Sequence, residues 1–134
     1  MKYPEFLPEN GAIGFVAPSF GCSIEPYHTA FLNAQKKFTA MGHGLELGPN
    51  CYASEGIGIS STPEACGAEL TEYYCSDKND ILISCGGGEL MCEILDKVDF
   101  DRIRAAKPKW YMGFSDNTNM TFLLATLCDT ASVY

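Results

Sequence analysis

The chain has 134 residues, of which 46% are hydrophobic and 19% are charged, and this balance predicts one globular domain with a hydrophobic core of its own. Nine Lys and Arg residues against seventeen Asp and Glu residues give a formal net charge of −8, which disfavours nucleic acid and anionic lipid as partners. The apolar runs are far shorter than the roughly 20 residues that span a bilayer, and the first residues do not resemble a signal peptide, so we expect a cytoplasmic protein without a membrane partner.

Short apolar runs alternate with segments of helical periodicity along the chain. Taken in order, these patterns predict a strand at 12–17, a helix at 27–41, a weak strand at 45–47, a helix from 62 to about 77, a strand at 80–85, a helix at 89–95, a short helix at 100–106, a strand at 109–113 and a helix at 120–127. Thr62 and Pro63 are typical of a helix start, and Gly42 is typical of a helix end.

The alternating order of these elements is typical of a parallel sheet. It predicts an α/β fold, a flavodoxin-like doubly wound parallel sheet with helices on both faces. The strands near 12–17, 80–85 and 109–113 are expected to lie parallel in one sheet, because successive strand–helix–strand units cross over with the same hand.

The end of the chain predicts that the sequence is a fragment. Residues 131–134 have strand character and stop without a cap or a polar tail, which is uncommon at the end of a natural domain. We therefore expect residues 1–134 to form the N-terminal α/β domain of a longer protein, with a C-terminal domain that lies outside this sequence.

Seven cysteines form an odd set without a C-x-x-C pair and without a histidine at metal-ligand spacing. They are Cys22, Cys51, Cys66, Cys75, Cys85, Cys92 and Cys128. The pattern predicts reduced thiols, with no disulfide framework and no metal site. Mass spectrometry of the non-reduced protein and metal analysis check this prediction, which one stoichiometric disulfide or one zinc ion per chain would contradict.

The segment Gly113-Phe114-Ser115-Asp116-Asn117 lies where a strand should turn into a helix, a junction that can hold a serine on a tight turn with its hydroxyl exposed. The amide of Asp116 would then lie near the Ser115 oxygen, at a helix N-terminus that favours a developing oxyanion. Ser115 is therefore the strongest nucleophile candidate. A plain helix cap is the alternative, and Asn117 departs from the small residue that the general hydrolase elbow has at this position.

Three glycines, Gly86, Gly87 and Gly88, follow a predicted buried strand and allow the backbone to approach a ligand closely. Their amide N–H groups could bind an anion or a carbonyl oxygen. Phosphate binding fits less well, because the spacing matches no phosphate-binding motif and Glu89 would repel a phosphate. A tight turn without a ligand is the structural alternative.

A catalytic serine needs a base, and the only histidines are His28 and His43. Both are expected to be solvated, although His28, which opens the helix after the first strand, stays a candidate substrate contact near Ser115. Glu89 and Glu93 would share a helix face at i, i+4, either as an acid–base pair or as a solvated face.

Three segments together resemble a known family: residues 13–19 (IGFVAPS), residues 86–89 (GGGE) and residues 113–118 (GFSDNT). In these segments and in their spacing the chain resembles the N-terminal domain of the LD-carboxypeptidase family of serine peptidases, which includes the microcin C self-immunity proteins. Members of this family release a terminal D-alanine from a muropeptide at an L,D bond. The immunity branch instead cuts the bond between the terminal aspartate of a peptide and an adenylate-like nucleotide group.

The resemblance implies that Ser115 is the nucleophile and that the amides of Asp116, Gly86 and Gly87 form the oxyanion hole. It also implies a catalytic Glu and His in the C-terminal domain, so the chain alone would be inactive. The implied partners are a small peptide or peptidyl-nucleotide substrate and the missing domain, with no cofactor and no metal, and a homodimer is left open. A non-catalytic flavodoxin-like module that binds a small ligand, or a purely structural domain, would be compatible with the same fold.

Overall fold

The computed structural model describes residues 1–134 and contains one four-stranded sheet, in which all neighbouring strands are parallel and the strand order is β2-β1-β3-β4. The strands are β1 (Ala12–Val16), β2 (Gly44–Leu47), β3 (Ile81–Ser84) and β4 (Tyr111–Met112). The predicted α/β fold is confirmed, and so is the parallel arrangement of the strands expected near 12–17, 80–85 and 109–113. The order is that of a doubly wound sheet.

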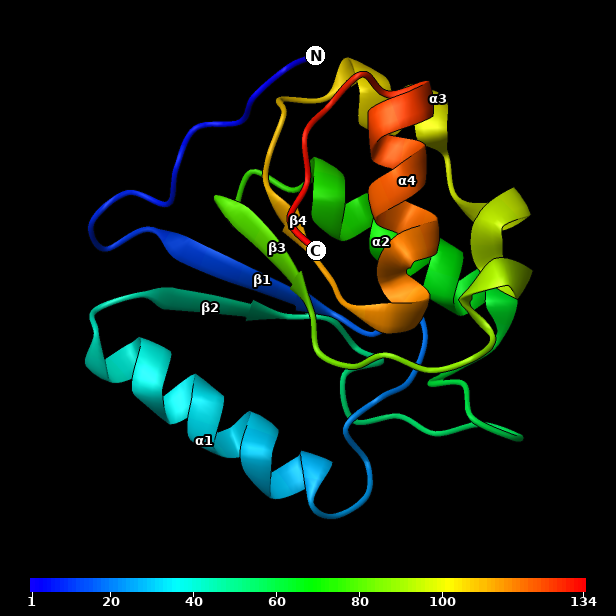
Figure 1. Cartoon of the computed structure of the whole chain (residues 1–134). Helices are drawn as coiled ribbons and strands as arrows, with labels where there is room; N and C mark the ends of the chain where they lie inside the picture. The colour runs from blue at the N-terminus through cyan, green and yellow to red at the C-terminus, as the bar shows by residue number, and fades with distance from the viewer.

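Helices cover both faces of the sheet (Figure 1). They are α1 (Tyr27–Ala40), α2 (Pro63–Cys75), α3 (Phe100–Ala105) and α4 (Thr118–Leu127), with two short 3-10 helices, η1 (Met91–Lys97) and η2 (Ser115–Asn117). Helix α1 lies on one face, and α2 and α4 lie on the other (Figure 1). No helix is both long enough and apolar enough to span a membrane.

The two faces have separate hydrophobic cores. On the α1 face, the ring of Phe15 in β1 packs edge-on against Phe31, with the ring centroids 5.2 Å apart. On the other face, Leu82 of β3 and Leu70 of α2 are fully buried together with Leu124 of α4. Successive side chains of a strand point to opposite faces of the sheet, so each strand contributes residues to both cores.

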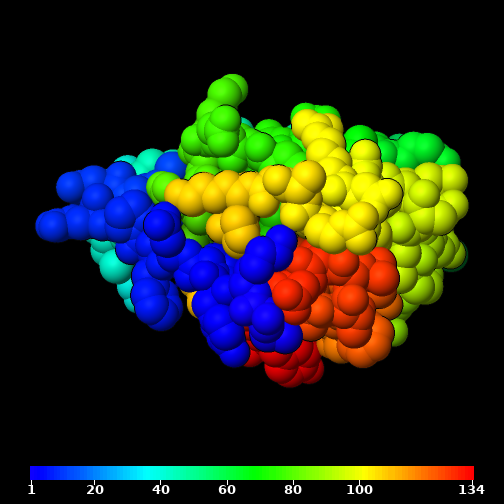
Figure 2. All heavy atoms as spheres, turned by 90° about the horizontal axis from the view of Figure 1, so that it is seen from above, coloured from blue at the N-terminus to red at the C-terminus, as the bar shows by residue number.

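The first and last residues lie side by side (Figure 2). The amide of Lys2 donates to the carbonyl of Asp129 at 2.6 Å, and the amide of Ala131 donates to the carbonyl of Lys2 at 2.9 Å. Further along, Val133 donates to the carbonyl of Tyr111 at 2.9 Å. The strand character of residues 131–134 therefore appears as backbone pairing beside β4.

The helix predicted at 89–95 is wrong in type and in position. The structure has a 3-10 helix from Met91 to Lys97, and Glu89 precedes it. The amide of Met91 donates a hydrogen bond to the Asp116 carboxylate at 2.8 Å, and this bond marks the start of the 3-10 helix. Helix α4 also begins earlier than expected, at Thr118.

The expected capping residues are confirmed. The Thr62 hydroxyl accepts a hydrogen bond from the amide of Ala65 at 3.2 Å, and Pro63 is the first helical residue of α2. Gly42 follows α1 with a φ of 92°, a left-handed conformation that glycine adopts without steric cost.

Buried ionisable groups make the stability of the fold depend on pH. Burial raises the pKa of the Cys66, Cys75 and Cys128 thiols, because the thiolate is poorly solvated there. Burial likewise raises the pKa of Tyr74 to about 12. Lys109 shows the opposite shift, since burial lowers the pKa of its ammonium group to about 8.

We expect the free energy of unfolding to fall as the pH rises from about 8.5 to 10. The thiols of the unfolded chain ionise near pH 8.5, whereas those of the folded chain keep their protons. The unfolded state therefore binds fewer protons in this window, and a rise in pH favours it over the folded state. Lys109 opposes this, because its folded form releases a proton near pH 8 and its unfolded form releases it only near 10.5. Because the thiols outnumber the lysine, the free energy of unfolding falls with pH. The fall is about 1.4 kcal/mol per pH unit for each net proton by which the two states differ.

Thermal unfolding in reducing buffer at several pH values measures this slope. The Lys109→Met variant should show a steeper fall in Tm between pH 8.5 and 10, because it lacks the opposing contribution. A Tm that rises over this range in the unmodified chain would contradict the prediction.

Candidate active site

Three segments meet at the carboxyl edge of the sheet, where β1, β3 and β4 end. They are residues 17–20 after β1, residues 85–88 after β3 and residues 113–117 after β4. Parallel strands present their carboxyl ends at one edge, and ligands of doubly wound folds bind there. The structure thus brings together the three segments on which the sequence analysis rests.

Ser115 lies on a tight turn between β4 and α4. It is the first residue of η2, its side chain is exposed, and its φ of 60° is in the left-handed region that residues other than glycine rarely adopt. Such a conformation costs about 1–3 kcal/mol and persists only where the surrounding structure enforces it. The Ser115 hydroxyl makes no hydrogen bond within the chain.

Asn117 enforces this turn. Its buried side-chain amide donates to the carbonyl oxygens of Gly86 at 2.9 Å and Phe114 at 3.1 Å, and its oxygen accepts the Tyr111 hydroxyl at 2.5 Å. A methyl group on Gly113 would lie 2.5 Å from Asn117 Cβ, so only glycine fits there. Asn117, which departs from the small residue of the general hydrolase elbow, therefore connects the turn at residues 113–117 (the serine turn) to the turn at residues 86–88 (the glycine turn).

The glycine turn lies directly beside Ser115. A methyl group built on Gly87 would lie 3.5 Å from Ser115 Cβ and 3.9 Å from Ser115 Oγ. A methyl group on Gly86 would instead lie 2.7 Å from the carbonyl oxygen of Phe20, which leaves no room for a side chain. The two glycines therefore differ, because Gly86 is required by packing and Gly87 borders the serine.

The amide N–H groups of Gly86, Gly87 and Asp116 make no hydrogen bond within the chain. Unbonded amides of partly buried residues are uncommon, since an unpaired backbone donor costs free energy unless water or a ligand receives it. Here they lie on the two turns that flank the Ser115 side chain, and they can serve an acceptor atom from outside the protein.

The half-buried carboxylate of Asp116 binds groups from other parts of the chain. Its Oδ2 accepts hydrogen bonds from the hydroxyl of Ser19 and from the amide of Met91, at 2.8 Å for the latter. Its Oδ1 accepts from the side-chain amide of Asn119 at 3.2 Å. Ser19 is fully buried, and the sequence analysis gave it no role.

A buried carboxylate, that of Glu69, supports the loops behind this edge. Glu69 in α2 accepts hydrogen bonds from the amides of Ala17 at 3.0 Å and Asn50 at 2.9 Å, which fastens the segments after β1 and β2 to the helix. Burial raises the pKa of Glu69. Glu69 lies on the buried face of α2 among apolar residues, and this position in the sequence could have indicated that its carboxylate binds groups inside the protein.

Neither histidine makes a hydrogen bond with Ser115. His28 packs against the ring of Tyr52, with the centroids 5.2 Å apart, and a contact between His28 and a substrate stays a prediction. The Nδ1 of His43 lies 3.0 Å from the carbonyl oxygen of Gly11, which precedes β1 and therefore lies at the opposite end of the sheet.

Glu89 and Glu93 do not form the expected pair on one helix face, because Glu89 lies outside η1. Both side chains are exposed. No group of three or more His, Cys, Asp or Glu side chains is arranged to hold a metal ion. An open hollow borders Ser115, with Leu95, Leu123 and Phe122 as apolar walls and Thr118 and Asn119 as polar ones.

The chain is similar to known proteins over most of its length. A family model described as the LD-carboxypeptidase N-terminal domain matches residues 13–134. No curated protein sequence matches the chain.

Several solved structures share the fold. An MccF-like protein from Bacillus anthracis superposes with a TM-score of 0.86 at 22% identity, over 98% of this chain and 40% of its own. A mutant of the microcin C7 self-immunity protein MccF, in complex with adenosine monophosphate, has a TM-score of 0.84 at 22% identity, over 92% and 37%. The muramoyltetrapeptide carboxypeptidase from Oxalobacter formigenes has a TM-score of 0.72 at 19% identity, over 90% and 38%. The chain thus spans about two fifths of the length of these proteins.

Proposed function

We propose that this chain, which belongs to the LD-carboxypeptidase family as its three segments predicted, is the nucleophile-bearing part of a serine carboxypeptidase. The remaining catalytic groups come from polypeptide outside residues 1–134, and we refer to the protein that contains both parts as the complete protein. The family assignment and the span of about two fifths of the structural relatives support this division.

One observation carries the catalytic part of the proposal. Ser115 is held on a left-handed turn with a free hydroxyl, and the unbonded amides of Gly87 and Asp116 flank it. In the proposed reaction the Ser115 Oγ attacks the carbonyl carbon of the substrate, and the amides of Asp116, Gly86 and Gly87 hold the oxyanion. The proton of the Ser115 hydroxyl passes through the base outside residues 1–134 to the leaving group as the scissile bond breaks. Water then attacks the acyl-enzyme, one of its protons returns to Ser115, and the acid is released.

The substrate is an amide-type bond at the C-terminal end of a small peptide. A muropeptide L,D bond and a peptidyl-nucleotide both fit this class, and the structural relatives include a muramoyltetrapeptide carboxypeptidase and a protein in complex with adenosine monophosphate. We place the reaction in the cytoplasm, with no cofactor and no metal ion.

A serine-reactive phosphonate tests the proposal directly. We expect it to label the complete protein on Ser115, as mapped by mass spectrometry of the digested adduct. Release of D-alanine from a muropeptide tetrapeptide, or of the nucleotide from a peptidyl-adenylate mimic, then identifies the substrate class. A complete protein that binds small anions or nucleotides in a thermal-shift assay, but neither reacts with the phosphonate nor hydrolyses either compound, would support a binding module instead.

The chain alone is expected to fold and to show no turnover on either substrate. Its Ser115 has no base within hydrogen-bond reach, and a serine hydroxyl without a base is a weak nucleophile at neutral pH. Oxyanion stabilisation alone retains only about 10³- to 10⁴-fold acceleration over water in the subtilisin example. Turnover by residues 1–134 that approaches that of the complete protein would show that the base lies in this chain.

A further inference from the structure

We propose that Ser19 is a positioning residue, which acts through the carboxylate of Asp116 to set the distance between the two halves of the oxyanion hole. This inference rests on the proposed function. It assigns a role to a side chain that does not touch the reacting atoms. It also separates two roles of Asp116, whose unbonded amide belongs to the proposed oxyanion hole and whose carboxylate binds Ser19 and Met91.

The two halves of the proposed oxyanion hole belong to different strands. The amide of Asp116 follows β4, and the amides of Gly86 and Gly87 follow β3. Strands β3 and β4 are paired only through Leu82 with Tyr111 and Ile83 with Met112, so their hydrogen bonds end before either turn begins. Contacts beyond the sheet must therefore hold the turns in register.

Ser19 and Asp116 supply such a contact. The fully buried Ser19 hydroxyl donates to Asp116 Oδ2, and the same oxygen accepts the amide of Met91, three residues after Gly88, at 2.8 Å. One carboxylate oxygen thus joins the segment after β1 and the start of η1 to the serine turn. Hydrogen bonds to a charged acceptor are stronger than neutral ones.

The segment that carries Ser19 also holds the glycine turn itself. The amide of Phe20 donates to the carbonyl of Gly87 at 3.0 Å. A methyl group on Gly88 would lie 2.2 Å from Ser19 Oγ, so the hydroxyl packs directly on the backbone of the turn. Ser19 therefore contacts both halves, the glycine turn by packing and the serine turn through Asp116.

The expected consequence is kinetic. Oxyanion donors act mainly in the transition state, so a shift of one half relative to the other lowers kcat and changes KM little. A displacement of about 1 Å can lower the rate about 10²-fold. In the complete protein we expect Ser19→Ala to lower kcat about 10- to 100-fold and to change KM by less than about threefold.

Asp116 offers a graded series. Asp116→Ala removes the acceptor and is expected to lower kcat at least as much as Ser19→Ala does. We call the two hydrogen bonds from the Ser19 hydroxyl and the Met91 amide to Asp116 Oδ2 the clamp. Asp116→Asn keeps one side-chain oxygen, which suffices because both bonds end on the same atom, and it should retain more of kcat than Asp116→Ala.

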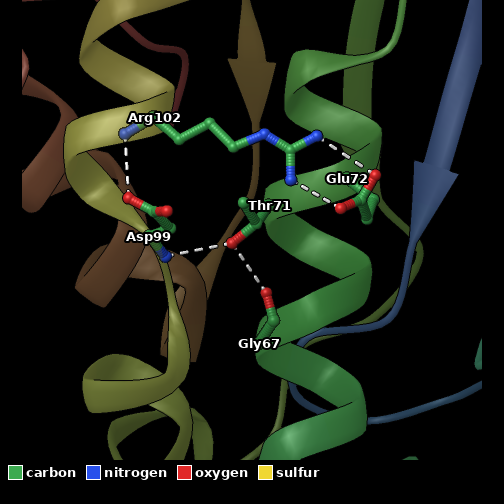
Figure 3. A network of polar contacts seen from close by, with 5 residues as sticks. All are labelled: Gly67, Thr71, Glu72, Asp99 and Arg102. Atoms are coloured by element: carbon green, nitrogen blue, oxygen red, sulfur yellow. Dashed lines mark hydrogen bonds and ion pairs between the residues drawn. The ribbon is translucent and has the colours of Figure 1, made fainter.

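Thr71 provides a matched control for a merely structural effect (Figure 3). Its buried hydroxyl also makes two hydrogen bonds, since it donates to the carbonyl of Gly67 at 2.9 Å and accepts from the amide of Asp99 at 3.1 Å. It joins α2 to the start of α3 and touches none of the three segments of the site. Thr71→Ala should lower the Tm about as much as Ser19→Ala does and should leave kcat unchanged.

Amide hydrogen exchange, resolved by residue in residues 1–134, tests the clamp without any catalysis. Ser19→Ala should speed exchange at Phe20 and Met91 at least about tenfold, whereas Thr71→Ala should speed it at Asp99 and not at these two residues. Unchanged exchange at Phe20 and Met91 in the Ser19→Ala chain would overturn the clamp. Unchanged kcat in Ser19→Ala, in a complete protein that Ser115→Ala inactivates, would overturn its role in positioning. An active Ser115→Ala protein would instead refute the proposed function, and the exchange experiment would still decide the clamp.

Discussion

Ser115→Ala is expected to lower kcat of the complete protein by at least about 10⁴-fold on whichever substrate it hydrolyses. The substitution removes the only atom that can form the acyl-enzyme, and removal of a nucleophilic serine in subtilisin costs about 2 × 10⁶-fold. The alanine side chain fits the turn, because the Ser115 hydroxyl makes no hydrogen bond whose loss would destabilise the fold. The measurement is kcat by release of D-alanine or nucleotide, together with the Tm of each protein.

Ser115→Gly serves as the matched variant. It should be equally inactive, yet more stable than Ser115→Ala by about 1 kcal/mol, because glycine adopts a φ of 60° without strain. A stability gain together with lost activity would show that the chain tolerates strain at this turn for the sake of the serine. Near-normal turnover in either variant would refute Ser115 as the nucleophile.

The fold could be predicted from the sequence because its strands and helices carry strong local patterns. The apolar run at 12–17 and the periodic segment at 27–41 became β1 and α1, and Thr62 caps α2 as expected. The failures lie where tertiary contacts decide local structure. The helix expected at 89–95 became a shifted 3-10 helix because the Asp116 carboxylate binds the amide of Met91.

The candidate site was predictable in its turns and unpredictable in its supports. Ser115 and Gly87 stand at strand ends, and the parallel order of the strands is sufficient to bring such residues to one edge. Ser19, Asn117 and Glu69 hold the turns through contacts across 97, 31 and 52 positions of the sequence, respectively. A local pattern does not indicate the partner of a contact at such a separation. The carboxylate of Glu69 inside an apolar helix face was a sequence signal of a buried role, but the structure was needed to find the partners of all three residues.

The two glycines next to Ser115 are expected to respond oppositely to alanine. At Gly87 the added methyl group makes only ordinary contacts, at 3.5 Å from Ser115 Cβ, and the residue needs no positive φ. The methyl group lies in the space beside Ser115 Oγ that a substrate carbonyl must enter to reach the amides. Gly87→Ala should therefore lower kcat/KM of the complete protein about 10²- to 10³-fold, the effect of losing an oxyanion donor, with little change in stability.

At Gly86 the methyl group would lie 2.7 Å from the carbonyl oxygen of Phe20, a backbone atom that cannot move without the segment after β1. Gly86→Ala should therefore lower the free energy of unfolding by about 1–3 kcal/mol, as overpacking does elsewhere. Denaturant unfolding of residues 1–134 measures the free energy of unfolding of both variants. The activity of each variant is measured as kcat/KM of the complete protein. If Gly87→Ala kept full activity while remaining folded, the acyl carbonyl would not bind between the two turns, and the oxyanion hole would have to be assigned to other donors.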